Sequence, residues 1–208
     1  MIAIIDYNAG NICSVENALG RLGCEYVLTS DPGVIRAADK VILPGVGNAA
    51  EAVAELEARG LVPVILSLRR PVLGICVGLQ LLCRDSEEGL MPSGTGAPGS
   101  PAGCKGLGLF DAHVRRFPDN PDAKVPHMGW NALGNLDSKL FAGLHGGEYV
   151  YFVHSYYPTL GPDTIATCRH GDTLFSAALK YENFYGTQFH PEKSGAVGAQ
   201  ILRNFLNL

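Results

Sequence analysis

Apolar positions in the first half of the chain follow two alternating rhythms. Short continuous apolar runs between polar or glycine-containing turns predict buried strands, and segments with apolar residues three or four positions apart predict helices between them. The expected strands are 3–6, 25–28, 40–43 and 71–74, and the expected helices are 12–22, a short one opened by Asp31 and Pro32, 49–58, 62–68 and one beginning at Val77. This alternation favours an α/β fold with a mostly parallel sheet covered by helices on both faces.

The second half has a different pattern, in which strand-like segments follow one another with glycine, proline and aspartate turns between them. The predicted strands are 106–110, 112–117, 148–157 and 165–168, followed by a hairpin of 175–179 and 183–189 and a closing helix at 197–206. We therefore expect additional, partly antiparallel strands in this half.

Between the halves, residues 89–104 are rich in glycine, proline, serine and alanine. Such a tract cannot bury a core, so we predict a flexible surface loop with no chemistry of its own. It is not expected to divide the chain, because 208 residues suit a single domain, 1–208.

Composition excludes several classes of protein. Apolar residues make up 47% of the chain and the formal net charge is −4, with the 16 basic residues dispersed, so nothing resembles a nucleic-acid-binding surface. The N-terminus lacks a basic segment and a cleavage site, and no apolar run reaches membrane-spanning length. We expect a cytoplasmic protein with no membrane or nucleic-acid partner.

Six cysteines raise the possibility of disulfides or a metal site. Their spacings contain no C-x-x-C, and no histidine pair stands at ligand spacing. We predict reduced, mostly structural thiols and neither a metal nor another cofactor.

One of these cysteines stands at a predicted sharp turn. Gly74, Cys76 and Gly78 form the pattern G-x-C-x-G between a buried strand and a helix, which is the cysteine version of a nucleophile elbow. The start of the following helix favours a thiolate, and its free N–H groups suit an oxyanion. A single pattern of this kind also fits a small buried cysteine that only packs.

A second segment supplies what a cysteine nucleophile needs. His190 and Glu192 follow a strand-like run, two positions apart, as a base and the acid that orients it. The alternative for these two residues alone is an exposed turn.

Together, Cys76, His190 and Glu192 occur in the chain order of the class I, triad-type glutamine amidotransferases, which this sequence resembles. The resemblance implies a three-layer sandwich with a central, mostly parallel sheet. It also implies that Cys76 attacks the carboxamide of glutamine, that His190 transfers the proton and that Glu192 orients His190.

A glycine turn at 44–47 follows the strand 40–43 and admits two explanations. It is either a tight connection or the source of a second oxyanion donor, Val46 N–H, facing that of Val77. The resemblance favours the second explanation and adds expected contacts to glutamine, from Gly45, Gly47 and Gln80 and, at its amino acid end, from Ser155 and Tyr156.

Three further segments narrow the resemblance to the glutaminase subunits of imidazole glycerol phosphate synthases of histidine biosynthesis. These segments are 6–23, 125–131 and 151–157. The resemblance implies a heterodimer with a barrel-shaped synthase subunit that receives the ammonia. It places Asn11, Trp130, Tyr151 and Lys193 at the interface, although Trp130 also fits a core aromatic and Lys193 a solvated charge.

Two other functions stay open from the sequence. One is a related hydrolase, such as a glutamyl peptidase or the glutaminase of the pyridoxal phosphate or anthranilate pathway. The other is a degenerate amidotransferase that only docks to a partner. The segments 6–11 and 126–131 argue against the first, and the complete triad argues against the second.

Overall fold

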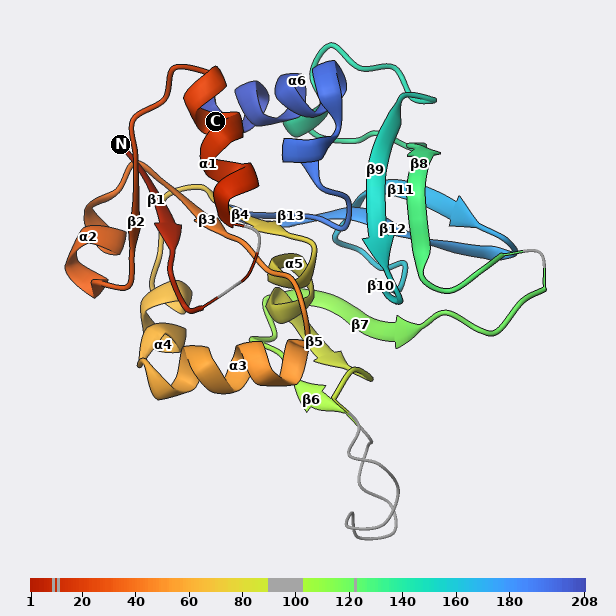
Figure 1. Cartoon of the computed structure of the whole chain (residues 1–208), viewed down its shortest axis with the longest axis horizontal. Coiled ribbons are helices and arrows are strands. Elements are labelled where there is room, and N and C mark those ends of the chain that lie inside the picture. Colours follow the sequence, from red (N-terminus) through yellow and green to blue (C-terminus); the bar gives the residue numbers. More distant parts are fainter. Residues whose placement is uncertain (9, 11, 90–102, 122) are drawn as a thin grey trace, which may run out of the picture.

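The computed structural model of the chain describes residues 1–8, 10, 12–89, 103–121 and 123–208. Its centre is a seven-stranded sheet (Figure 1). In spatial order the strands are β11 (Thr164–His170), β12 (Thr173–Tyr181), β13 (Phe184–Thr187), β4 (Val72–Ile75), β3 (Lys40–Leu43), β1 (Ile2–Ile5) and β2 (Tyr26–Thr29). The five strands from β13 to β2 are parallel, and β12 and β11 add antiparallel pairs at one edge.

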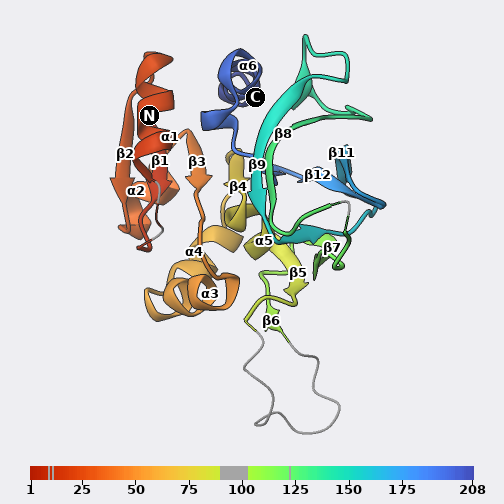
Figure 2. The same cartoon turned by 45° about the vertical axis from the view of Figure 1, so that its right-hand side comes forward.

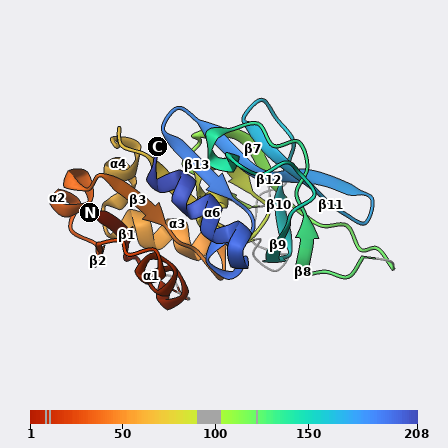
Figure 3. The same ribbon diagram turned by 90° about the horizontal axis from the view of Figure 1, so that it is seen from above.

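Helices cover both faces of this sheet, which confirms the three-layer prediction (Figure 1). One layer holds α1 (Ile12–Arg21) and α6 (Gly195–Leu206), and Figure 3 shows α6 lying across the strands. The other layer holds α3 (Ala49–Ala58), α4 (Leu61–Leu66) and α5 (Val77–Leu82), with α2 (Pro32–Ala37) beside α4 and β1. Because both faces are covered, β1 and β4 are buried at every position, as their apolar runs predicted.

Local sequence explains where two of these helices form. Asp31 accepts hydrogen bonds from the N–H groups of Gly33 and Val34, so it caps α2 as predicted. In α6 the buried residues Ile201, Leu202 and Phe205 recur at helical spacing and face the sheet side of the molecule.

Two smaller sheets extend the second half (Figure 2). One contains β10 (Tyr156–Pro158), β7 (Phe110–Arg116), β5 (Cys83–Ser86) and β6 (Cys104–Lys105) in that order, and the other pairs β8 (His127–Ala132) with β9 (Tyr149–His154). Two short 3-10 helices, η1 (Lys139–Phe141) and η2 (Pro191–Lys193), are the remaining helical elements among the described residues.

Several predicted boundaries were wrong, and hydrogen bonding explains the clearest case. Residues 106–109 are not a strand, because the N–H groups of Leu107 and Leu109 donate to the carbonyls of Leu81 and Leu82 at the end of α5. The single strand predicted at 148–157 is broken at Ser155 into β9 and β10. The strands β5 and β8 were not predicted, and Cys104, placed in the flexible loop, pairs in β6. Residues 90–102 of that loop lie outside the described residues.

Candidate active site

The cysteine elbow is present as predicted. Cys76 follows β4, precedes α5 and adopts φ 53° and ψ −107°, a backbone conformation that non-glycine residues rarely accept. Its N–H donates to the carbonyl of Thr187 at 2.8 Å, and its carbonyl accepts from Leu79 and Gln80. These bonds hold the strained turn, so the strain marks a position selected for where its side chain points.

The flanking glycines are required by close backbone approach. A Cβ atom at Gly78 would overlap the carbonyl oxygen of Leu43, and one at Gly74 would lie 2.7 Å from the carbonyl oxygen of Gly78. Gly45 is under the same constraint, because a Cβ atom there would overlap the backbone nitrogen of Gly78. The turn at 44–47 therefore packs closely against the elbow, and Val46 lines the same pocket as Cys76.

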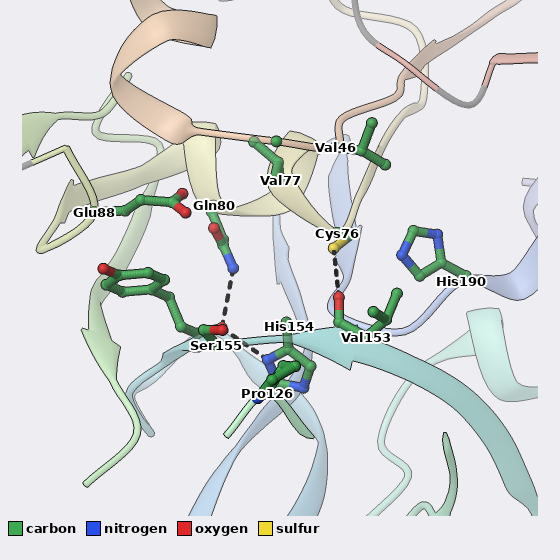
Figure 4. Close-up of a pocket in the computed structure, with 12 residues that line it drawn as sticks. Val46, Cys76, Val77, Gln80, Glu88, Pro126, Val153, His154, Ser155 and His190 are labelled. Atoms are coloured by element: carbon green, nitrogen blue, oxygen red, sulfur yellow. Dashed lines mark hydrogen bonds between the residues drawn. The ribbon is translucent and has the colours of Figure 1, made fainter. Parts of the chain in front are cut away.

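The parallel pairing of β13 with β4 brings the histidine segment to the elbow. Thr187 lies opposite Ile75 in the register, so the chain that continues to His190 runs beside the chain that continues to Cys76. Figure 4 shows the imidazole of His190 beside the sulfur of Cys76. The ends of neighbouring parallel strands therefore bring together residues that are far apart in the sequence.

His190 and Glu192 form a buried pair. Nδ1 of His190 lies 2.8 Å from Oε1 of Glu192, and both side chains are almost wholly excluded from solvent. Burial alone would lower the pKa of His190, but its interactions with Cys76 and Glu192 outweigh burial and raise that pKa to about 10. The imidazolium form is thus favoured at neutral pH, and the exposed-turn alternative for these residues is wrong.

The other ring nitrogen of His190, Nε2, is available for proton transfer. Within the described residues, Nε2 of His190 is buried and makes no hydrogen bond. His190 lines a pocket of about 340 Å³ together with Cys76. A histidine beside a pocket, oriented by a carboxylate on one nitrogen and unbonded on the other, has the arrangement of a general acid and base.

Hydrogen bonds also fix the backbone of His190. Its N–H donates to the carbonyl of Tyr151 at 2.9 Å, and its carbonyl accepts the hydroxyl of Ser194 at 2.6 Å. The same hydroxyl accepts the N–H of Tyr151 at 2.9 Å. Sequence reasoning missed Ser194, because a serine before a helix reads as an ordinary cap.

Comparison with known proteins agrees with this geometry. Residues 3–208 match the family described as glutamine amidotransferase class-I. The chain belongs to this family. It is 50% identical over 208 residues to a protein of Bacteroides thetaiotaomicron named imidazole glycerol phosphate synthase subunit HisH, covering 100% of this chain and 99% of that protein. A protein of Bacteroides fragilis with the same name is 52% identical, with the same coverage. A crystal structure of a glutamine amidotransferase, 20% identical, superposes with a TM-score of 0.67 over 100% of this chain and 98% of that one.

For a class-I glutamine amidotransferase, the pocket beside Cys76 is the place to seek the substrate. It is lined by most of the residues predicted to contact glutamine or an oxyanion: Val46, Gly47, Val77, Gln80, Ser155 and Tyr156. Gly45 is not among the lining residues and packs instead against Val77 and Gly78. The individual roles of these residues stay predictions.

Sequence reasoning missed one charged residue of this amidotransferase pocket. Glu88 lines it, and its Oε2 accepts the N–H of Ala49 at 2.8 Å. Burial raises the pKa of this carboxyl, and the hydrogen bond from Ala49 partly opposes the rise. In the sequence, Glu87 and Glu88 precede a polar loop and look like solvated charges, so no local signal separates them.

The predicted interface residues that the structure describes lie on one surface. Trp130 is 55% exposed, which rules out the core alternative, and its ring stands edge-on to Tyr151 with centroids 6.1 Å apart. Lys193 is exposed on η2, next to Gly195, which approaches the Trp130 ring. Asn11 lies outside the described residues.

Among the described residues, no group of three histidine, cysteine, aspartate or glutamate side chains is placed to hold a metal ion. All six cysteines are free thiols. No helix in the described ranges has the length and apolar character needed to cross a membrane.

Proposed function

We propose that this chain is the glutaminase subunit of an imidazole glycerol phosphate synthase, which hydrolyses glutamine to glutamate and passes the ammonia to a separate synthase subunit. The observation that carries the proposal is the strained elbow of Cys76 facing a buried His190–Glu192 pair across one pocket. The relatives named above, similar over the whole chain, support the choice of pathway.

The pocket has complementary groups for the two ends of glutamine. Glu88 offers a carboxylate to the α-ammonium group at one side of the pocket, and Cys76 stands at the other side for the carboxamide (Figure 4). Ser155 and Tyr156 also line the pocket, and we assign them to the amino acid end of the substrate. A pocket of about 340 Å³ is of the size that holds small ligands.

The chemistry follows from these positions. The thiolate of Cys76 adds to the carboxamide carbon, and the N–H groups of Val77 and Val46 stabilise the oxyanion of the tetrahedral intermediate. His190 gives its proton to the departing nitrogen, so ammonia leaves and a thioester remains. His190, now neutral, takes a proton from water as it attacks the thioester, and glutamate and the thiolate are released.

Ammonia released into neutral water is protonated and ceases to be a nucleophile, so a closed route to a partner is expected. The exposed Trp130, beside Tyr151 and Lys193, is where we place a barrel-shaped synthase subunit in a heterodimer. We also place the complex in the cytoplasm.

The test is ammonia release from glutamine by the purified chain, with and without a synthase barrel subunit and its ribonucleotide substrate. Release that needs the partner and disappears in Cys76→Ala, but not in the control Cys24→Ala, would support the proposal. Release without any effect of the barrel subunit would favour a glutaminase of another pathway. No release under any condition would favour a docking module.

A further inference from the structure

A buried side chain outside the predicted triad contacts the nucleophile. Gln188 stands between β13 and His190 and is completely buried. Its Nε2 lies 3.5 Å from the sulfur of Cys76 and donates to it. Sequence reasoning gave this glutamine no role, because nothing in its neighbourhood links it to a residue 112 positions away.

The orientation of the Gln188 amide is fixed by a second glutamine. Nε2 of Gln80 donates to the carbonyl of Tyr156 at 3.1 Å and to Oε1 of Gln188 at 3.0 Å. A backbone carbonyl only accepts, so the Gln80 atom that faces it must be the nitrogen. It follows that Gln188 turns its oxygen toward Gln80 and its N–H toward the sulfur.

The Tyr156 carbonyl is held in turn by a histidine pair. Nδ1 of His154 lies 2.7 Å from this oxygen and must carry a proton to bond it. Nε2 of a neutral His154 then accepts from Nδ1 of His127 at 2.9 Å, and Nε2 of His127 accepts from Nδ2 of Asn131 at 3.1 Å. Figure 4 shows Gln80 and His154 reaching the same carbonyl from two sides.

The far end of the chain is anchored to the backbone. Oδ1 of Asn131 accepts the N–H of Ala132, and Nδ2 donates to the carbonyl of Arg169 as well as to His127. Neither amide orientation nor tautomer is therefore free to change at one position without breaking a bond at the next. A connected network of this kind, buried at both glutamines and both histidines and half-buried at Asn131, holds its members rigidly.

We propose that Gln188 is a further catalytic residue, whose amide N–H stabilises the Cys76 thiolate, and that His127 and His154 are positioning residues that keep this N–H aimed at the sulfur. The inference rests on the proposed use of Cys76 as a nucleophile. A hydrogen bond to a charged group is worth more than one between neutral groups, so the donor acts on the thiolate more than on the thiol. The network also connects the nucleophile to β8, the strand whose exposed face carries Trp130.

The test is the rate at which iodoacetamide alkylates Cys76 in the full chain, resolved by peptide mass spectrometry. Cys13 is exposed and serves as an internal reference in the same sample. The variants are Gln188→Glu, which keeps an acceptor toward Gln80 but removes the N–H at the sulfur, and His154→Gln. The matched control is Gln200→Leu on α6, whose amide bonds Asn204.

We expect Gln188→Glu to slow alkylation of Cys76 about tenfold at neutral pH, the factor that one lost bond to a charged group carries, and Cys13 to be unaffected. His154→Gln should slow Cys76 by a smaller factor in the same direction, and Gln200→Leu should have no effect. An unchanged or faster rate at Cys76 in a folded Gln188→Glu variant would overturn the proposal. Unfolding would expose the buried cysteines and raise their alkylation rates. An unfolded variant is therefore distinguished from a folded variant in which Cys76 reacts more slowly. Alkylation needs neither glutamine nor a partner, so its outcome is independent of whether the chain proves to be a glutaminase.

Discussion

Ser194 donates its hydroxyl to the backbone carbonyl of His190 across 2.6 Å, and through this bond the start of α6 holds the residue that we propose as the catalytic base. Both residues are buried, so water does not compete for the bond. The hydroxyl also accepts from Tyr151, on the strand that carries the proposed interface. A single hydroxyl therefore joins the base, the last helix and β9.

Replacing this serine is expected to loosen the base without removing it. In Ser194→Ala the His190 carbonyl and the Tyr151 N–H both lose a buried partner, at a cost of about 1–3 kcal/mol of folding free energy. We expect kcat of glutamine hydrolysis to fall about tenfold, with KM little changed, because the substrate pocket does not include Ser194. Ser194→Thr keeps the hydroxyl and should retain most activity. Equal loss in both variants would mean that the site tolerates no change of size, and that the hydroxyl is not the cause.

The negative charge of Glu192 is predicted to be needed for glutamine hydrolysis. In Glu192→Gln the imidazolium of His190 loses its negative partner, and the pKa of His190 falls from its raised value. We expect kcat to fall about 10⁴-fold, the loss that the same acid-to-amide replacement causes in Ser-His-Asp triads. The measurement is glutamine hydrolysis in the presence of the synthase partner. Glu57→Gln, on the exposed face of α3, is the control, and a loss smaller than tenfold in Glu192→Gln would contradict the role of the carboxylate.

Glu88 is predicted to recognise the α-ammonium group of glutamine. Glu88→Gln keeps the oxygen that accepts from Ala49 but removes the charge, so the pocket should stay intact. We expect KM for glutamine to rise about 10- to 100-fold, the effect of one ion-paired hydrogen bond, with a smaller change in kcat.

A substrate analogue sharpens this test. Glutaramate is glutamine without its amino group, so wild type should use it poorly and Glu88→Gln should use both compounds about equally. Glu87→Gln is the matched control, because the neighbouring Glu87 bonds Arg116 on β7 and does not line the pocket. A Glu88→Gln variant that still prefers glutamine as strongly as wild type would exclude this role.

The buried histidine pair predicts a stability loss in mild acid. Burial lowers the pKa of His154 to about 3 and that of His127 to about 4, with the nearby His170 adding to the effect. In the unfolded chain both groups titrate near 6.5, so below that pH the unfolded state binds more protons than the folded state. Stability from this source is complete above about pH 7 and declines from about pH 6.5 down to about pH 4 for His127 and about pH 3 for His154. Each histidine should remove about 2 kcal/mol at pH 5.

Urea unfolding at pH 7.5 and pH 5 measures this loss. His154→Gln removes one titrating group, so its stability should differ less between the two pH values than that of wild type. His145→Gln, in an exposed turn, is the control and should keep the wild-type difference. An undiminished difference in His154→Gln would show that the pair does not carry the acid sensitivity.

Local patterns in the sequence were sufficient for much of the architecture and for the triad. The apolar runs of β1, β3 and β4 and the helical spacing in α1 and α6 reflect burial on each element, which acts over a few residues and is visible in a short window. The elbow at Cys76 was predictable from its short G-x-C-x-G pattern, although only Gly74 meets a constraint from within five residues, while Gly78 is constrained by the distant Leu43. His190 and Glu192 were predictable as a pair because they are two positions apart.

Tertiary structure alone decided which other side chains lie against Cys76, against His190 and in the pocket. Glu88, Gln188 and Ser194 reach the site through strand order and through bonds to residues distant in the chain, and each is an ordinary polar residue in its own neighbourhood. Residues 106–109 satisfy the end of α5 instead of forming a strand, again through bonds made only after folding. Hydrogen bonds between distant segments form only where the folded chain places those segments side by side. A short window of sequence does not contain that information.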